Sequence, residues 1–289
     1  MAVLAIAFTS DGRRVAAGSH DGSVHVWDTW TGMPAMSMTK HSSPVAALAF
    51  APAGDLLATA GQDRVMLWDV GAAGGKPRRT LAGQGGTVSS VAFSADGSML
   101  AGAGEDGIRV WDVASGALLR TMAGSGPGVL SVAFEPKGTW LAAASRDHTV
   151  RLWDAAEGSH VRTLYGLSGN ALSVAFDGQR VAAGAGDGSV GVWDASIGER
   201  LLYLTGHAKL VNSVSLSADG SRLMTVSASD RVVMWDAKTG DRLGTVGPRP
   251  KKTLTTAVLS PSGTHLASGS VEAAVELWCV ASLPPGGKP

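Results

Sequence analysis

Cysteine, charge and long apolar segments are scarce in this chain of 289 residues. The single cysteine, Cys279, excludes a framework of disulfide bridges. Charged residues make up 17%, and 24 basic residues balance 24 acidic ones, so no net positive charge attracts nucleic acid or an anionic membrane. No apolar run approaches the roughly 18 residues that span a bilayer, and residues 1–8 lack the charged and polar parts of a signal peptide. We therefore expect a soluble cytoplasmic protein that binds neither nucleic acid nor membrane.

Glycine, by contrast, is abundant. The chain contains 39 glycines, about twice the usual share of ~7%. Glycine in a helix interior costs about 1 kcal/mol relative to alanine, so this composition argues against long helices. It favours short strands joined by many tight turns, and therefore predicts an all-β protein.

A repeat of about 42 residues accounts for nearly the whole chain, so we expect one domain built by repetition. Tryptophan followed by aspartate occurs six times, and a seventh, degenerate copy has cysteine in place of the aspartate. The tryptophans of this repeat are Trp27, Trp68, Trp111, Trp153, Trp193, Trp235 and Trp278. Alternating apolar residues, with Gly or Asp at fixed offsets, predict four short strands per unit, which we call a to d in chain order.

Four short antiparallel strands, repeated seven times, are typical of a β-propeller. With six Trp-Asp pairs at this period, the chain resembles the WD-repeat (Trp-Asp repeat) family over essentially its full length. The resemblance implies an all-β, seven-bladed ring in which strand a of each blade lines a central channel. The d–a and b–c loops would form the top face, and the a–b and c–d loops the bottom face. We expect blades at about 1–40, 41–82, 83–124, 125–165, 166–206, 207–247 and 248–289.

In this family a blade often buries a hydrogen-bonded set of His, Ser or Thr, Asp and Trp. The second blade can hold all four members, which are His41, Thr59, Asp63 and Trp68. The sixth blade has His207 and Trp235, but the spacing places Val226 where the hydroxyl should be, so its set is expected to be incomplete. Other blades keep a turn carboxylate without an obvious His partner, and we expect these carboxylates to accept turn N–H groups. They include Asp21, Asp147 and Asp187.

The seventh blade is predicted to lack its outer strand. Six d strands can be recognised, near residues 34–39, 78–82, 118–123, 160–165, 200–205 and 242–246. After Trp278 only residues 279–289 remain, and the proline-rich stretch 282–289 cannot continue a ladder. Three explanations stay open: a fragment or a slightly weaker ring, a partner chain that adds the strand by β-augmentation, and a tail that lies over the edge.

The motifs of common catalytic and metal sites are absent from the sequence. It contains no Gly-rich phosphate loop ahead of a helix, no His/Cys cluster at zinc spacing and no Gly-x-Ser-x-Gly elbow. We therefore expect no enzyme activity, no cofactor and no metal. The leading hypothesis is a non-catalytic scaffold that binds other proteins as a subunit of a larger assembly. The alternative is an enzyme or a phosphopeptide-binding module that uses the channel mouth.

Candidate binding residues are those that vary between blades. On the top face an apolar centre with polar neighbours fits a protein-binding patch, although the leucines could equally plug the channel mouth. This set consists of Leu130, Leu172, Leu210, Arg146, Asn170, Asn212, Glu105 and His20. A basic top loop can take an acidic or phosphorylated segment, or is simply solvated. Its charged residues are Arg249, Lys251 and Lys252. On the bottom face, Trp30 and Trp140 either contact a partner or lie flat on a neighbouring loop.

Overall fold

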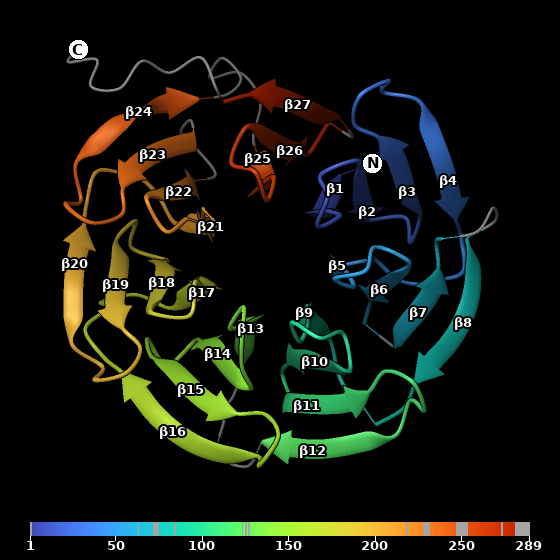
Figure 1. Cartoon of the computed structure of the whole chain (residues 1–289), viewed down its shortest axis with the longest axis horizontal. Coiled ribbons are helices and arrows are strands. Elements are labelled where there is room, and N and C mark those ends of the chain that lie inside the picture. The colour runs from blue at the N-terminus through green and yellow to red at the C-terminus, as the bar shows by residue number, and fades with distance from the viewer. Residues whose placement is uncertain are drawn as a thin grey trace.

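The structure is a computed structural model in which residues 2–62, 64–71, 75–83, 85–122, 124, 126, 128–217, 219–227, 232–246, 254–272 and 274–280 are described. These residues form 27 strands and no helix, and hence no helix that is long and apolar enough to cross a membrane. The strands make seven sheets arranged as blades around a central axis (Figure 1). The prediction of an all-β, seven-bladed β-propeller is therefore confirmed.

Each blade is an antiparallel meander, with strand a nearest the axis and strand d at the perimeter (Figure 1). The a strands are β1 (Val3–Phe8), β5 (Ala47–Phe50), β9 (Val88–Phe93), β13 (Val129–Phe134), β17 (Ala171–Phe176), β21 (Val211–Leu216) and β25 (Leu254–Leu259). The b strands are β2 (Arg14–Ser19), β6 (Leu56–Ala60), β10 (Met99–Gly104), β14 (Trp140–Ser145), β18 (Arg180–Ala185), β22 (Arg222–Ser227) and β26 (His265–Ser270).

The c strands are β3 (Val24–Asp28), β7 (Val65–Asp69), β11 (Gly107–Asp112), β15 (Val150–Asp154), β19 (Val190–Asp194), β23 (Val232–Asp236) and β27 (Val275–Cys279). The d strands are β4 (Pro34–Met38), β8 (Lys76–Leu81), β12 (Leu118–Met122), β16 (Ser159–Leu164), β20 (Arg200–Leu204) and β24 (Arg242–Val246). Blade 7 has three strands among the described residues, β25 to β27, which confirms the prediction that its outer strand is missing.

The turn between strands c and d shows how the Trp-Asp repeat shapes a blade. In blade 3 the carboxylate of Asp112 accepts the backbone N–H of Ser115 at 2.7 Å, and the carbonyl of Asp112 accepts that of Gly116 at 2.7 Å. Gly116 has a φ of +74°, a left-handed conformation that glycine adopts without steric cost. The sequence repeat is thus a repeat of turns of one kind, and these turns return the chain for each d strand.

The hydrophobic core lies between neighbouring blades. Trp153 of blade 4, for example, packs in one buried cluster with Val110 and Met122 of blade 3. Burying an aliphatic side chain contributes about 1.5–3 kcal/mol. Each blade is therefore stabilised largely by its two neighbours, as in other repeat proteins.

The ring closes at its inner side between blade 7 and blade 1. The hydroxyl of Thr255 in β25 donates to the carbonyl of Val3 in β1. Val3 and Ile6 also share a buried cluster with Ala267 of β26. Farther out, β27 is the last described strand of blade 7, and no described d strand covers blade 1 on that side (Figure 1).

Candidate functional site

The loops that precede strand a and the turns between strands b and c meet on one face of the ring, which we call the top surface. The backbone N–H of Arg146, in a b–c turn, donates to the carbonyl of Gly128 just before β13, at 3.1 Å. His20 makes the same bond to Ala2 at 3.0 Å. Residues from these two kinds of loop are therefore neighbours on the top surface.

Two of the candidate leucines lie in β-bulges at the start of the inner strands. In β13, Val129 pairs with Ser145 and Ser131 with Ala144, so Leu130 has no cross-strand partner. Leu172 in β17 and Asn212 in β21 occupy the same bulged position. A bulge bends the strand and re-aims the side chain at that point. These three residues are partly exposed.

Leu210 extends this group to a third blade. It immediately precedes β21 and is 37% exposed. The inner strands β13, β17 and β21 pack side by side (Figure 1), so blades 4 to 6 present their leucines on adjacent segments. We call Leu130, Leu172, Leu210 and Asn212 the top-surface patch.

Of the remaining top-surface candidates, three lie in or beside blades 4 to 6 and one does not. Arg146 and Asn170 are exposed and belong to blades 4 and 5 themselves. Glu105 is exposed in blade 3, beside blade 4, whereas His20 lies in blade 1, which does not border blades 4 to 6. The structure therefore does not bring His20 together with the leucines.

His148 is a top-surface residue that the sequence prediction missed. It has a φ of +69° and is the one residue other than glycine with a positive φ in the described part of the chain. Its position in the b–c turn is taken by Gly22 in blade 1 and Gly188 in blade 5, both with positive φ. Aligning the turns on their aspartates, so that His148 follows Asp147 as Gly188 follows Asp187, would have revealed it. Backbone strain of this kind concentrates at functional positions.

Several candidates lie outside the described residues. They are Asp63 of the second blade's hydrogen-bonded set and the basic-loop residues Arg249, Lys251 and Lys252.

On the opposite face, the two extra tryptophans differ sharply in exposure. Trp30, in the c–d turn of blade 1, is 86% exposed. Trp140 begins β14, is partly buried, and packs against the cluster that contains Ala195 of blade 5. With Gln179 and Ser196 it lines a shallow groove of about 560 Å³. Trp140 therefore lies against the neighbouring blade, whereas Trp30 is free to contact other molecules.

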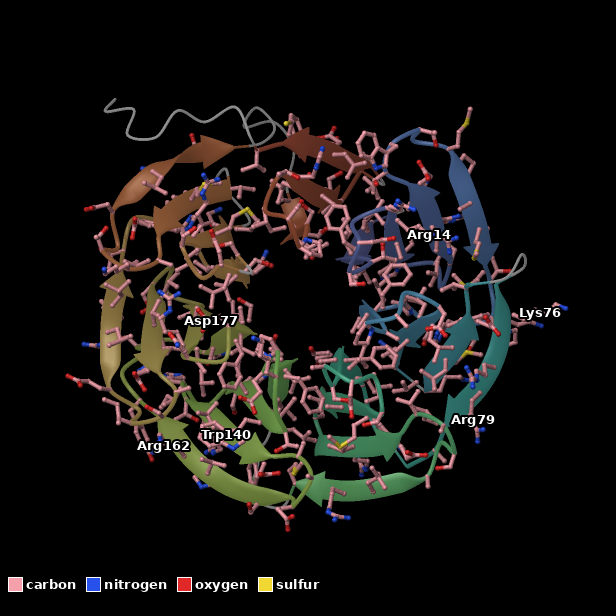
Figure 2. All side chains as sticks on the ribbon, viewed as in Figure 1. Arg14, Lys76, Arg79, Trp140, Arg162 and Asp177 are labelled. Atoms are coloured by element: carbon pink, nitrogen blue, oxygen red, sulfur yellow. The ribbon has the colours of Figure 1, made fainter. Side chains whose placement is uncertain are left out.

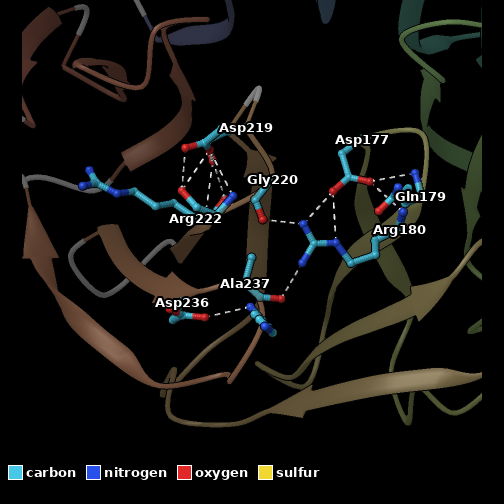
Figure 3. A network of polar contacts seen from close by, with 11 residues as sticks. Asp177, Gln179, Arg180, Asp219, Gly220, Arg222, Asp236 and Ala237 are labelled. Carbon is cyan, nitrogen blue, oxygen red and sulfur yellow. Dashed lines mark hydrogen bonds and ion pairs between the residues drawn. The ribbon is translucent and has the colours of Figure 1, made fainter.

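In two other blades the residue that begins strand b, the position of Trp140, also contacts the next blade (Figure 2 labels Trp140 and Arg14). Arg14 begins β2 and donates to the carbonyl of Val70 in blade 2 at 2.6 Å. Arg180 begins β18 and donates to the carbonyl of Ala237 in blade 6 at 2.8 Å. Figure 3 shows Arg180 held by the carboxylate of Asp177, with Nη2 to Oδ2 at 2.8 Å. In blades 1, 4 and 5 this position therefore links the blade to the next one, whereas Arg222 at the same position in blade 6 is exposed.

The hydrogen-bonded set of blade 2 is present as far as its residues are described. Nε2 of His41 lies 2.7 Å from the hydroxyl oxygen of Thr59, which also accepts the indole N–H of Trp68 at 2.7 Å. All three side chains are buried. This set anchors the top end of the blade and has a structural role.

Blade 6 contains the same arrangement, and the expectation that Val226 replaces the hydroxyl is wrong. Thr225 Oγ1 lies 2.6 Å from Nε2 of His207 and accepts the indole N–H of Trp235 at 2.8 Å. Thr225 pairs with Val233 across the sheet, as Thr59 pairs with Met66. The b–c turn of blade 6 is one residue longer than that of blade 2, so counting back from the tryptophan points to the wrong residue.

In blades 3 and 5 the indole N–H donates to a backbone carbonyl, whereas in blade 7 the acceptor is again a strand-b hydroxyl. Trp111 donates to the carbonyl of Ala82 at 2.8 Å, and Trp193 donates to that of Tyr165 at 3.0 Å. Trp278 donates to the hydroxyl of Ser268 at 3.0 Å. Trp27 stands apart because it is only partly buried.

The turn carboxylates accept local hydrogen bonds. Asp21 accepts the N–H of Ser23 at 2.9 Å, and Asp187 that of Ser189 at 3.0 Å. Asp147 accepts the N–H of Thr149 at 3.2 Å and forms an ion pair with Arg151 at 2.6 Å. Hydrogen bonds from the hydroxyl and backbone of Ser23 hold the pKa of Asp21 below its usual value. These carboxylates therefore shape the turns in which they lie. The described residues include no group of three His, Cys, Asp or Glu side chains that could hold a metal ion.

The ring of seven sheets, with a tryptophan near the end of each c strand, defines a repeat-built β-propeller. The family described as "WD domain, G-beta repeat" matches residues 1–28, 32–69, 75–112, 116–154, 158–194 and 198–236. The chain therefore belongs to the WD-repeat family, which confirms the resemblance. Propellers of this family are typically non-catalytic modules that bind other proteins, and this supports a role as a protein-interaction scaffold.

Individual relatives share short segments with the chain. It is 39% identical over 67 residues to the periodic tryptophan protein 2 homolog of Neurospora crassa, covering 22% of this chain and 8% of that protein. It is 36% identical over 47 residues to the Dictyostelium discoideum homolog, covering 16% and 5%. It is 38% identical over 60 residues to WD repeat-containing protein slp1 of Schizosaccharomyces pombe, covering 20% and 12%. The matched segments thus span a small part of these relatives.

Proposed function

We propose that this protein is a non-catalytic cytoplasmic scaffold, a subunit of a larger protein assembly. It binds partners through the top-surface patch of blades 4 to 6 and through the open edge of blade 7. The observation that carries the first contact is the pair of bulges at Leu130 and Leu172. Each turns a leucine out of its ladder onto the top surface, beside the exposed Leu210.

The surroundings of the patch fit a protein partner. An interface centre is apolar and its rim is polar, and Arg146, Asn170 and Asn212 supply polar groups around the leucines. The strained backbone of His148 lies in the same turn as Arg146. Strain of this kind persists only where the surrounding structure holds it, and it is common at binding positions.

The test is affinity purification of the tagged protein from its native source, with identification of the chains that co-purify. The test variant combines Leu130→Asp, Leu172→Asp and Leu210→Asp. Because charge in an apolar interface centre is strongly unfavourable, we expect capture of the top-surface partners to fall at least tenfold. Capture by the unchanged protein should persist at high salt, because apolar contacts are not screened.

A matched control carries three Leu→Asp changes at the perimeter, at Leu118, Leu119 and Leu201, which are 46%, 39% and 48% exposed. This variant should capture the same partners as the unchanged protein. Circular dichroism and thermal unfolding verify that both variants fold. Equal capture by the patch variant and the control would show that the leucines do not bind partners, and selective loss of phosphorylated partners would indicate a phosphopeptide-binding module.

A further inference from the structure

Five seams between blades share one contact that involves the last residue of strand d. In blade 1 this residue is Met38, which is buried in a cluster with Trp68 of blade 2. The equivalent pairs are Leu81 with Trp111, Met122 with Trp153, Leu164 with Trp193, and Leu204 with Trp235. The five tryptophans are at most 6% exposed. An aliphatic side chain from one blade therefore covers the tryptophan of the next.

A second contact comes from the residue two positions earlier. In three d strands this residue is arginine, in the sequence Arg-Thr-Leu or Arg-Thr-Met. The side chain of Arg162 lies over Gly198 in the c–d turn of blade 5 and donates to the carbonyls of Ser196 and Ile197 at 2.7 and 2.6 Å. Arg79 makes the same contacts with the turn of blade 3.

Among the described residues, neither contact is made between blade 7 and blade 1. A Cβ atom added to Gly32, the equivalent turn glycine, would meet nothing within 4 Å. Leu277 is 37% exposed, whereas the residues at its position in the other six blades are at most 2% exposed. A groove of about 480 Å³ opens here, lined by Trp27, Val275 and Leu277 among others. The exposed Trp30 stands on the turn beside it.

The register of a missing fourth strand follows from the complete blades. Val65 pairs with Leu81, and Leu67 pairs with Arg79. Val275 and Leu277 hold the same positions relative to Trp278 as Val65 and Leu67 hold relative to Trp68. A strand added to β27 in this register would place its aliphatic residue opposite Val275 and its arginine opposite Leu277.

We propose that this groove binds an extended segment of a partner protein as the fourth strand of blade 7, a proposal that rests on the scaffold function above. The segment runs antiparallel to β27 and carries an Arg-x-Leu or Arg-x-Met motif. Its Leu or Met covers Trp27, and its guanidinium lies over Gly32 and donates to the carbonyls of Trp30 and Thr31. The exposed edge of β27 supplies backbone hydrogen bonds, as in β-augmentation.

The stretch that follows β27 in the printed sequence does not carry this motif. Residues 280–289 contain no arginine, and Pro284 and Pro285 have no N–H to donate to a ladder.

The probe is a fluorescent peptide that copies residues 158–165, which include the Arg-Thr-Leu of β16. Its binding to the full chain is measured by anisotropy. We expect saturable binding that is at least tenfold weaker for the peptide with Leu164→Asp, because the motif then lacks its aliphatic residue. The Leu277→Glu protein should show the same loss, whereas the Leu118→Glu control should bind normally. Hydrogen exchange of the Val275–Cys279 amides should slow when the peptide binds.

Three outcomes would overturn the proposal. The first is no binding to a folded ring, or equal binding to the Leu277→Glu protein. The second is binding only to a chain that ends at Val280, which would make the protein's own tail the occupant. The third is a dimer that Leu277→Glu dissociates, which would make a second copy the occupant. The triple leucine variant of the top surface should still bind the peptide, so failure of the patch and failure of this site are separable.

Discussion

Removing the hydroxyl of Thr225 tests whether the buried set of blade 6 stabilises the ring. Thr225 is 0% exposed, and its oxygen contacts both Nε2 of His207 and the indole N–H of Trp235. Thr225→Val keeps the shape of the side chain but leaves these two buried nitrogens without this partner. Each such loss costs about 1–3 kcal/mol, so we expect the free energy of unfolding to fall by about 2–6 kcal/mol.

Two further variants separate the hydroxyl from the packing. Thr225→Ser keeps the oxygen and removes one methyl group, so it should cost only about 1 kcal/mol. Val226→Thr places a hydroxyl at the position that spacing alone suggested. Because Val226 is 1% exposed, this buried hydroxyl should destabilise the fold by about 1–3 kcal/mol.

The assay is equilibrium unfolding in urea, followed by tryptophan fluorescence and circular dichroism. Coincident transitions from the two probes are needed before free energies are compared. If Thr225→Val costs no more than Thr225→Ser, the hydroxyl contributes nothing and the reasoning is refuted. A stabilising effect of Val226→Thr would refute the register assigned to the set.

Three other changes test the seams and turns by the same assay. Arg180→Gln should cost about 2–4 kcal/mol because Asp177 loses its partner, whereas Arg222→Gln, at the equivalent but exposed position, should change stability by less than about 0.5 kcal/mol. His148→Gly should stabilise the fold by about 1 kcal/mol, because glycine adopts φ of +69° without strain, and should weaken partner capture. Hydrogen bonds from the Ser217 hydroxyl and the Ser221 backbone lower the pKa of Asp219 from 3.8 to about 2. The stability that this carboxylate contributes is therefore complete above pH 3.8 and is lost as the pH falls toward 2, and Asp219→Asn should flatten that slope.

The fold was predictable because its determinants are local and repeated. Each Trp-Asp pair and each turn glycine marks a turn that depends on local residues only. The period of about 42 residues therefore predicts the blades. The same repeat predicted that blade 7 lacks a d strand, and none is found among the described residues. Thr225 was missed because strand pairing, not distance from the tryptophan, decides which hydroxyl meets the histidine, and turns of different length shift that distance by one residue.

The candidate surfaces were less predictable because contacts between blades decide exposure. Trp30 and Trp140 look alike in the sequence, yet Trp140 packs on blade 5 whereas Trp30 is 86% exposed. The sequence likewise suggested an open edge at β27, but not that Trp27 and Gly32 of the next blade would be uncovered with it. The exposure of these two residues depends on contacts between blades 7 and 1, whose segments lie far apart in the chain.

Because side chains reach from one blade to the next, the stability of the ring is connected to the binding of a partner segment. In most blades the d strand covers the tryptophan of the next blade. No d strand is described for blade 7, and the groove lies on blade 1 beside Trp27. A segment that fills this groove therefore binds the assembled ring and not the unfolded chain. Such a ligand stabilises the fold in proportion to its occupancy, by about 2.7 kcal/mol at a concentration 100 times its Kd. The inner contacts of Thr255 and Val3 hold the ring closed without it, so strand capture adds stability to a ring that already exists. A scaffold built in this way is most stable when its partner is bound.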